Sequence, residues 1–209
     1  MFLKENFEHF GTGTRVFSSV AEALAALASE LAEGDRQQTQ DFVLQPHVPG
    51  PMLWHRRKFH VRVWALYIAQ PSTTRRGVVR AWLHDRGTVA VATDPWQLDA
   101  MERTSQVTSK ASPRFVYHEW ETYPAAHAAI TANAIKLSRQ LASSWRGRVV
   151  RRPHFSLAGL DYILDEDCTA HLLEANFGSK LVDVEMVEGL VSVVFYGEDG
   201  AAQGWRSLG

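Results

Sequence analysis

The chain has 209 residues, of which 45% are hydrophobic and 22% are charged, and its 22 Lys and Arg residues nearly balance 23 Asp and Glu residues. These proportions exclude an intrinsically disordered chain and a collagen-like repeat. A net charge of −1 disfavours a protein that works mainly on nucleic-acid phosphate, because such proteins are usually much more basic.

The cysteine content and the hydropathy of the chain bear on its location. The single cysteine, Cys168, allows no internal disulfide and suits a reducing compartment. No apolar run approaches the roughly 20 residues of a membrane span, and the start of the chain does not continue into the apolar region of a signal peptide. We therefore expect a cytoplasmic protein without a membrane partner.

The first 50 residues predict short strands and one helix. An apolar start leads into a segment with two glycines, Phe10–Thr14, and then into β-prone residues 15–17. A capping-box pattern at Ser19–Glu22 opens an Ala- and Leu-rich helix that ends at Gly34. Residues 42–44 are typical of a buried strand that stops before Pro46.

A long strand is predicted from Lys58 to Ile68, with apolar residues at alternate positions on one face. Its other face would present Lys58, His60 and Arg62 side by side. Ammonium and guanidinium groups on one face can bind phosphate oxygens and neutralise charge that develops during phosphoryl transfer. The alternative is an exposed edge strand whose cations protect against aggregation.

The second half of the chain mixes strands and helices. Residues 78–83 and 89–92 flank His84–Gly87 and predict a hairpin, whereas Arg103–Arg114 lacks periodicity and predicts a loop. Tyr123–Trp145 predicts an amphipathic helix, and a final hairpin is expected from residues 157–164 and 169–176. Because strands and helices do not strictly alternate, the sequence favours an α+β fold.

The final hairpin carries a candidate metal site. If a four-residue turn pairs Asp161 with Leu172, then Asp161, Glu174 and Asn176 converge on one face, whereas a one-residue shift of register would split them. Two carboxylates and an amide oxygen suit Mg²⁺ bound together with phosphates. The alternative is that Asp161 is an ordinary strand-end residue and Glu174 is solvated. Their apolar neighbours count against it, because an unpaired carboxylate is costly there.

Two weaker patterns involve anions. Lys4 followed by Gly11 and Gly13 is typical of a phosphate-covering loop, because glycine lets backbone N–H groups approach an anion; an ordinary turn with two glycines is the alternative. Local basic clusters could attract an acidic partner, or could be a solvated surface of mixed charge. They lie at Arg56-Arg57-Lys58, at Arg75, Arg76 and Arg80, and at Arg146, Arg148, Arg151 and Arg152.

Taken in chain order, these segments resemble motifs of the tubulin–tyrosine ligase and ligase-like family, which has the ATP-grasp fold. The resemblance covers most of the chain. The four matching places are Lys4 with Gly11-Thr12-Gly13, Phe42-Val43-Leu44-Gln45, Arg57 to Trp64, and Leu160-Asp161-Tyr162 with Leu172-Leu173-Glu174-Ala175-Asn176.

The resemblance implies an α+β ATP-grasp domain at residues 1–195, with central and C-terminal subdomains and no N-terminal subdomain, followed by a C-terminal tail at 196–209. It implies a cytoplasmic, microtubule-associated ligase. With ATP and Mg²⁺, such an enzyme joins a free amino acid to tubulin or another acidic protein tail through an acylphosphate.

The resemblance also assigns roles to residues. Lys58 and Arg62 would be catalytic, and Asp161, Glu174 and Asn176 would hold Mg²⁺. The nucleotide would be bound by Lys4, Gly11, Gly13, Gln45, His47, Val48, Lys58 and Arg62.

Three departures from the family pattern motivate an alternative function. His60 stands where the family has an acidic residue, Ala90 where it has a substrate-binding arginine, and Gln106–Ser109 replaces an H-[LV]-T-N motif and keeps only Thr108. The alternative is a catalytically inactive nucleotide- or tubulin-binding module of the same fold. The start on the Lys4 strand further suggests a fragment or a reduced descendant of a longer enzyme. Nucleic-acid binding is a third possibility, which the net charge disfavours.

Overall fold

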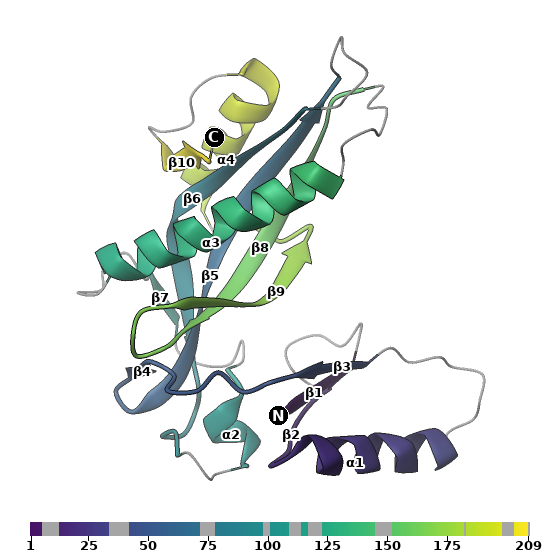
Figure 1. Ribbon diagram of the computed structural model, residues 1–209. Coiled ribbons are helices and arrows are strands. Elements are labelled where there is room, and N and C mark those ends of the chain that lie inside the picture. The colour runs from purple at the N-terminus through teal and green to yellow at the C-terminus, as the bar shows by residue number, and fades with distance from the viewer. Residues whose placement is uncertain are drawn as a thin grey trace. The chain divides into compact units, whose positions relative to one another are not determined.

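The computed structural model describes residues 1–5, 13–33, 42–71, 78–97, 101–108, 114–116, 123–144, 152–181, 183–197 and 203–208. The chain divides into two compact units, a smaller one of Met1–His60 with Ala90–Arg114 and a larger one of Val61–Val89 with Phe115–Gly209. Both units combine helices with antiparallel strands (Figure 1). This confirms the predicted α+β class and is compatible with an ATP-grasp-type fold.

The smaller unit contains a three-stranded antiparallel sheet in the order β2-β1-β3, formed by Phe2–Glu5 (β1), Thr14–Val16 (β2) and Phe42–Gln45 (β3). The strand predicted at residues 42–44 exists, but it lies at an edge and Val43 is 53% exposed. The prediction that this strand is buried is therefore wrong.

Helix α1, Val20–Glu33, confirms the helix predicted after the capping box. Its N-terminus is held from both sides, because the Glu22 N–H donates to Ser19 Oγ at 3.1 Å and the Ser18 N–H donates to Glu22 Oε2 at 3.0 Å. These bonds satisfy donors that have no partner within the helix. The predicted stop at Gly34 lies outside the described residues.

The larger sheet has the strand order β10-β6-β5-β8-β9, with β4 paired to β5 and β7 paired to β6. Strand β5 therefore lies between β6 and β8, so the alternative of an exposed edge strand is wrong. The strands are β4, Leu53–Trp54; β5, Arg57–Gln70; β6, Val78–Val91; β7, Arg114–Val116; β8, His154–Leu164; β9, Ala170–Phe177; and β10, Trp205–Ser207.

Strand β5 is buried on both faces from Val63 to Ala69. Trp64 and Leu66 pack with Met186 of α4, Val184–Val191, in one apolar cluster. Figure 1 shows helix α3, Tyr123–Ser144, lying across strands of this sheet. Helix α3 confirms the predicted amphipathic helix, because Ile130 of the expected apolar stripe is fully buried.

The hairpin predicted around His84–Gly87 is wrong, because β6 runs unbroken from Val78 to Val91. The His84 side chain is 1% exposed; its Nδ1 accepts the Arg86 N–H at 3.0 Å, and its Nε2 donates to the Gln203 carbonyl at 2.8 Å. A hydrogen bond to a distant part of the chain thus satisfies the buried His84 ring, although the sequence around it is typical of a turn. Burial lowers the pKa of His84, which agrees with the neutral ring that these bonds require.

Two further stretches differ from expectation. Arg103–Gln106 forms a short helix, α2, inside the predicted loop. Residues 203–208 lie within the predicted C-terminal tail, yet they supply strand β10, which pairs with β6 through Trp205↔His84. Trp205 is fully buried and donates from its Nε1 to the Met186 carbonyl at 3.0 Å, so this part of the tail belongs to the core of the larger unit.

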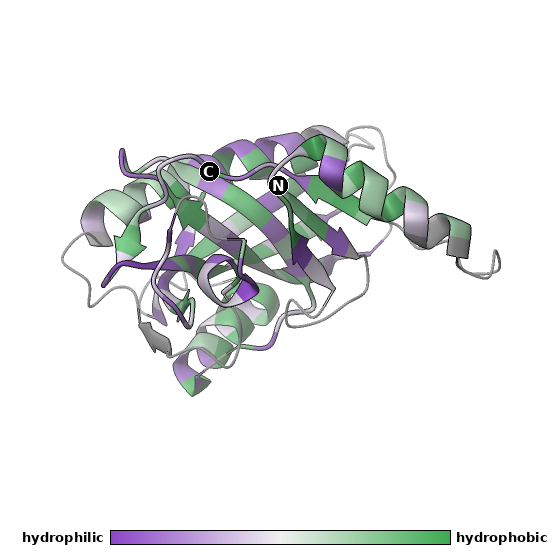
Figure 2. Cartoon of the chain, turned by 90° about the horizontal axis from the view of Figure 1, so that it is seen from below, coloured by the Kyte–Doolittle hydropathy of each residue, from purple (hydrophilic) through white to green (hydrophobic). Residues whose placement is uncertain are grey.

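Figure 2 shows hydrophilic and hydrophobic residues side by side along the helices. Within the described part of the chain, none of the helices combines the length and apolar character that a membrane crossing requires.

We predict that Trp205→Ala lowers the free energy of unfolding of the larger unit by about 3–5 kcal/mol, because it empties a fully packed site. Urea titration followed by circular dichroism measures this change. Arg206→Ala on the same strand is the matched control: its side chain is 65% exposed, so we expect a change within about 1 kcal/mol. A loss below 1 kcal/mol for Trp205→Ala would contradict the placement of β10 in the core.

Candidate functional site

The β8–β9 hairpin brings the three predicted metal-ligand side chains together, although its predicted register is wrong. The ladder pairs Tyr162 with Leu172, one residue away from the expected pairing of Asp161 with Leu172. A β-bulge at Leu173 then shifts the register by one more residue, so that Asp161 pairs with Glu174. The bulge therefore restores the shared face that the one-residue shift alone would have destroyed.

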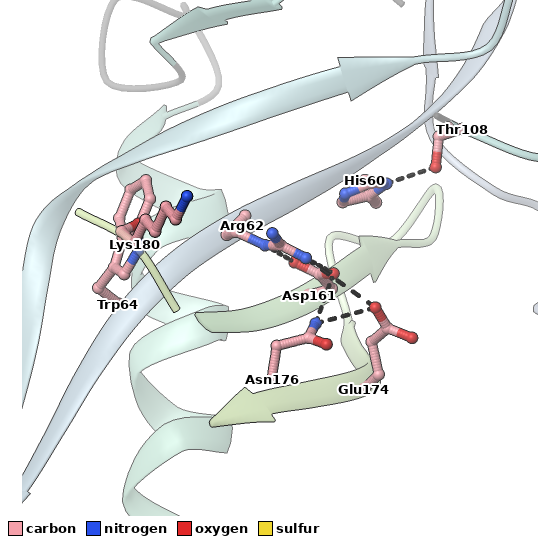
Figure 3. Close-up of polar contacts among 8 residues, drawn as sticks. All are labelled: His60, Arg62, Trp64, Thr108, Asp161, Glu174, Asn176 and Lys180. Atoms are coloured by element: carbon pink, nitrogen blue, oxygen red, sulfur yellow. Dashed lines mark hydrogen bonds and ion pairs between the residues drawn. The ribbon is translucent and has the colours of Figure 1, made fainter. Parts of the chain in front are cut away.

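Figure 3 shows Arg62 of β5, Asp161 of β8, and Glu174 and Asn176 of β9 pointing toward one another. The Arg62 guanidinium holds Asp161 in a fork, with Nε to Oδ1 and Nη2 to Oδ2 both at 2.6 Å. Asn176 Nδ2 donates to Glu174 Oε1 at 2.9 Å and lies 3.4 Å from Asp161 Oδ2. We call these four residues the carboxylate cluster.

One end of the carboxylate cluster is buried and the other end is exposed to solvent. Asp161 is 3% exposed, whereas the Glu174 side chain is 47% exposed. The fork to Asp161 raises the pKa of Arg62 despite partial burial, and the Glu174 charge adds to the effect at a distance of 3.9 Å. Asp161 is thus a buried, paired carboxylate within β8, not the ordinary strand-end residue of the alternative.

The segment after β9 lies beside Gly159 and the stem of Arg62. Trp64 donates from its Nε1 to the Lys180 carbonyl at 3.1 Å (Figure 3), which fixes the chain next to Ser179. A Cβ on Gly159 would lie 2.4 Å from Ser179 Oγ and 3.3 Å from Arg62 Cδ. Glycine at position 159 therefore gives the Arg62 stem and Ser179 the room that they occupy.

The donor set of the carboxylate cluster fits Mg²⁺. Carboxylate and amide oxygens are the hard ligands that this ion takes from proteins, usually together with substrate phosphates. The fit depends on the Asn176 amide as well as on the two carboxylates. Among the described residues, no group of three or more His, Cys, Asp and Glu side chains could hold a metal ion.

A second cluster surrounds Lys58 in the smaller unit. Lys58 is 3% exposed, and its Nζ lies 3.1 Å from His47 Nε2, 3.2 Å from Gln106 Oε1 and 4.9 Å from the centre of the Phe2 ring. Gln106 is held in turn by its Nε2, which donates to the Gln97 carbonyl at 3.1 Å. Within the described ranges, no carboxylate pairs with the Lys58 ammonium.

This lysine cluster therefore holds a buried positive charge among neutral groups. Burial lowers the pKa of Lys58 to about 8. Burial also lowers the pKa of His47, and the Lys58 charge lowers it further. A buried cation that has only neutral neighbours is stabilised by any anion that reaches it, so the cluster is a candidate anion site.

Phe2 links the other residues predicted at the nucleotide to this cluster. Its ring stacks on His47 at 5.1 Å between centres. Lys4 lies two residues further along β1 and so shares the Phe2 face, and Gln45 is the cross-strand partner of Phe2. His47 Nδ1 lies 3.3 Å from the Val48 carbonyl. With Lys58, five predicted nucleotide residues thus lie on three segments of the smaller unit that Phe2 connects.

The glycine-containing segment is described only in part. Gly13 directly precedes β2, which pairs antiparallel with β1 through Lys4↔Thr14, so this segment joins two neighbouring strands. Gly11 lies outside the described residues, as do Arg75, Arg76, Arg146, Arg148 and Arg151 of the predicted basic clusters.

Gln106 and Phe2 take part in the lysine cluster although the sequence does not indicate them as site residues. Gln106 departs from the family motif, yet it is 3% exposed and bonded to Lys58. The departure from the motif is a signal for this position, but no local pattern indicates its partner. Another departure, His60, contacts Thr108 through its Nδ1 (Figure 3), so two of the replaced positions interact with kept residues.

The fold and the two clusters define a mixed α+β protein with one candidate cation site and one candidate anion site. Residues 1–112 match the sequence profile of the Tubulin-tyrosine ligase family, and the chain belongs to this family. Members of the family generally use ATP and Mg²⁺, and membership points to a ligase-type function. The match includes the lysine cluster and ends before the β8–β9 hairpin. No curated protein matches the chain.

We predict that Lys58 makes the stability of the smaller unit depend on pH. Burial lowers its pKa from 10.5 to about 8, so between these pH values the unfolded chain binds more protons at this residue than the folded chain does. The free energy of unfolding should therefore rise with pH across this window, relative to Lys58→Met, by up to about 3 kcal/mol.

Urea titrations of the wild-type and Lys58→Met chains between pH 7.5 and 10.5 (a window set by the pKa range of lysine) measure this difference. Lys136→Met, at an exposed position of α3, is the control and should follow the wild-type curve. If the wild-type and Lys58→Met curves run parallel, the Lys58 ammonium is not the buried charge described above.

Proposed function

We propose that the chain is an ATP- and Mg²⁺-dependent ligase that joins an amino acid to tubulin or a similar acidic protein tail. The observation that carries this proposal is the carboxylate cluster, in which two carboxylates and an amide converge beside an arginine, in a chain of the tubulin–tyrosine ligase family. We further propose a cytoplasmic, microtubule-associated location, because the expected acceptor is found there.

The proposed reaction has two steps. An acceptor carboxylate oxygen attacks the γ-phosphorus of ATP, the bond from that phosphorus to ADP breaks, and an acylphosphate forms. The amine of the amino acid then attacks the acyl carbon, so a C–N bond forms, phosphate leaves and the amine loses a proton. When bound, Mg²⁺ supplies positive charge that stabilises the phosphates during transfer.

Each cluster has a role that its own chemistry supports. Asp161, Glu174 and Asn176 would hold the cation. Lys58 would bind phosphate oxygens, and it would gain from doing so because an anion supports its charged form. Arg62 would stabilise the transferring phosphate or the acylphosphate. Lys4, Gly11, Gly13, Gln45, His47 and Val48 would complete the nucleotide site.

Exposed arginines among the described residues support an acidic acceptor. Arg56, Arg80 and Arg152 are exposed, and on a chain of net charge −1 such positions can attract a Glu-rich tail at low salt.

A second candidate function is an inactive nucleotide- or tubulin-binding module. Ala90 favours this alternative, because it stands where the family has a substrate-binding arginine, is 4% exposed and carries no charge. It is also favoured by His60, which replaces an acidic residue and contacts Thr108. Both departures would weaken amino-acid or acceptor binding more than nucleotide binding.

We predict that Glu174→Ala abolishes ATP-dependent incorporation of labelled amino acids into a tubulin-tail peptide, because it removes one of two cation-binding carboxylates. Glu166→Gln, at an exposed position of the β8–β9 turn, is the matched control and should keep wild-type incorporation. Unchanged incorporation by Glu174→Ala would show that the metal assignment is wrong. ATP binding without incorporation across a panel of amino acids and acceptors would support the inactive module.

A further inference from the structure

In the carboxylate cluster, N–H donors stand where a metal ion would bind. Both Asp161 oxygens accept from Arg62 at 2.6 Å, and Asn176 directs its Nδ2 at Glu174 Oε1. The Asn176 amide would have to turn before it could offer its oxygen to a cation. The carboxylates are thus held by the same kind of electrostatic contact that a cation would supply.

The charges of the carboxylate cluster are not balanced by Arg62 alone. Asp161 and Glu174 carry two negative charges, whereas the guanidinium carries one positive charge and lies 3.9 Å from Glu174. Because Asp161 is nearly inaccessible to water, it needs a positive partner at all times. Arg62 meets this need for Asp161, and it contacts the exposed Glu174 only at 3.9 Å.

We propose that Arg62 and a divalent cation are alternative partners of Asp161. In this arrangement Arg62 keeps the buried carboxylate neutralised until the cation binds, and it then withdraws from Asp161. Its guanidinium becomes available to an anion of the substrate. The inference rests on the proposed function, because it takes the carboxylate cluster to be the cation site.

The surroundings of the pair allow such an exchange. The Arg62 side chain is 25% exposed, against 4% for Asp161, so the arginine has a path to solvent while the aspartate stays fixed. The β5–β8 ladder pairs the two residues through the backbone, so the sheet does not depend on their side-chain contact. Because residue 159 is glycine, the Arg62 stem and the Ser179 side chain both fit beside it without a clash.

The first test compares the affinity for Mn²⁺ of the full-length wild-type and Arg62→Lys chains by isothermal titration calorimetry. Lysine keeps the positive charge but loses the two-pronged fork, so a change reports on competition rather than on net charge. We expect Arg62→Lys to bind Mn²⁺ about tenfold more tightly, which corresponds to the loss of one charge-assisted hydrogen bond. Arg139→Lys, at an exposed position of α3, should bind as the wild-type chain does.

The second test follows the Arg62 Nε–H resonance by ¹⁵N nuclear magnetic resonance. The resonance is assigned by its absence from the Arg62→Lys spectrum, or by sequential assignment if that variant does not fold. As Mg²⁺ is added to the wild-type chain, we expect the Arg62 Nε–H resonance to shift or broaden, with the same midpoint concentration as cation binding. The Arg139 resonance should stay in place.

The outcomes separate this inference from the proposed function. If Mn²⁺ binds and Glu174→Ala loses that binding, the cation site stands. In that case, an unchanged affinity of Arg62→Lys together with an unmoved Arg62 resonance overturns the exchange. If the wild-type chain binds Mn²⁺ no better than Glu174→Ala does, the cation site fails and the exchange fails with it.

Discussion

Asp161 is a carboxylate in a part of the sheet that has little water, and a carboxylate in such a place must have a cation beside it. Arg62 supplies the charge from the neighbouring strand, through two parallel hydrogen bonds. The face of β5 that carries Arg62 also carries Trp64 and Leu66, which pack on α4. The polar cluster therefore begins where the apolar core ends, and the position of Arg62 in the sequence sets that border.

The two units handle charge in opposite ways. The carboxylate cluster contains more negative than positive charge, whereas Lys58 has a positive charge among neutral groups. A cluster of the first kind favours a cation, and a cluster of the second kind favours an anion. ATP with Mg²⁺, which members of the family generally use, carries both kinds of charge.

Local patterns in the sequence predicted the elements better than their partners. Helix α3 and the β8–β9 hairpin could be recognised because periodicity and turn residues act over short distances. The bulge at Leu173 could not, because the sequence pattern leaves the register of the hairpin open. The burial of Lys58 could not either, because it depends on contacts such as that with Gln106, 48 residues further along the chain. The local pattern around His84 predicts a turn for the same reason, because its hydrogen-bond partner, Gln203, is 119 residues away.

The bulge at Leu173 also limits how this hairpin can change during evolution. Strand residues alternate between two faces, so inserting or deleting one residue between the turn and Glu174 would send Glu174 and Asn176 to the opposite face from Asp161. A change of two residues would keep them together. Between the turn and Glu174, related chains can therefore differ in strand length in steps of two, or else must gain or lose a bulge at the same time.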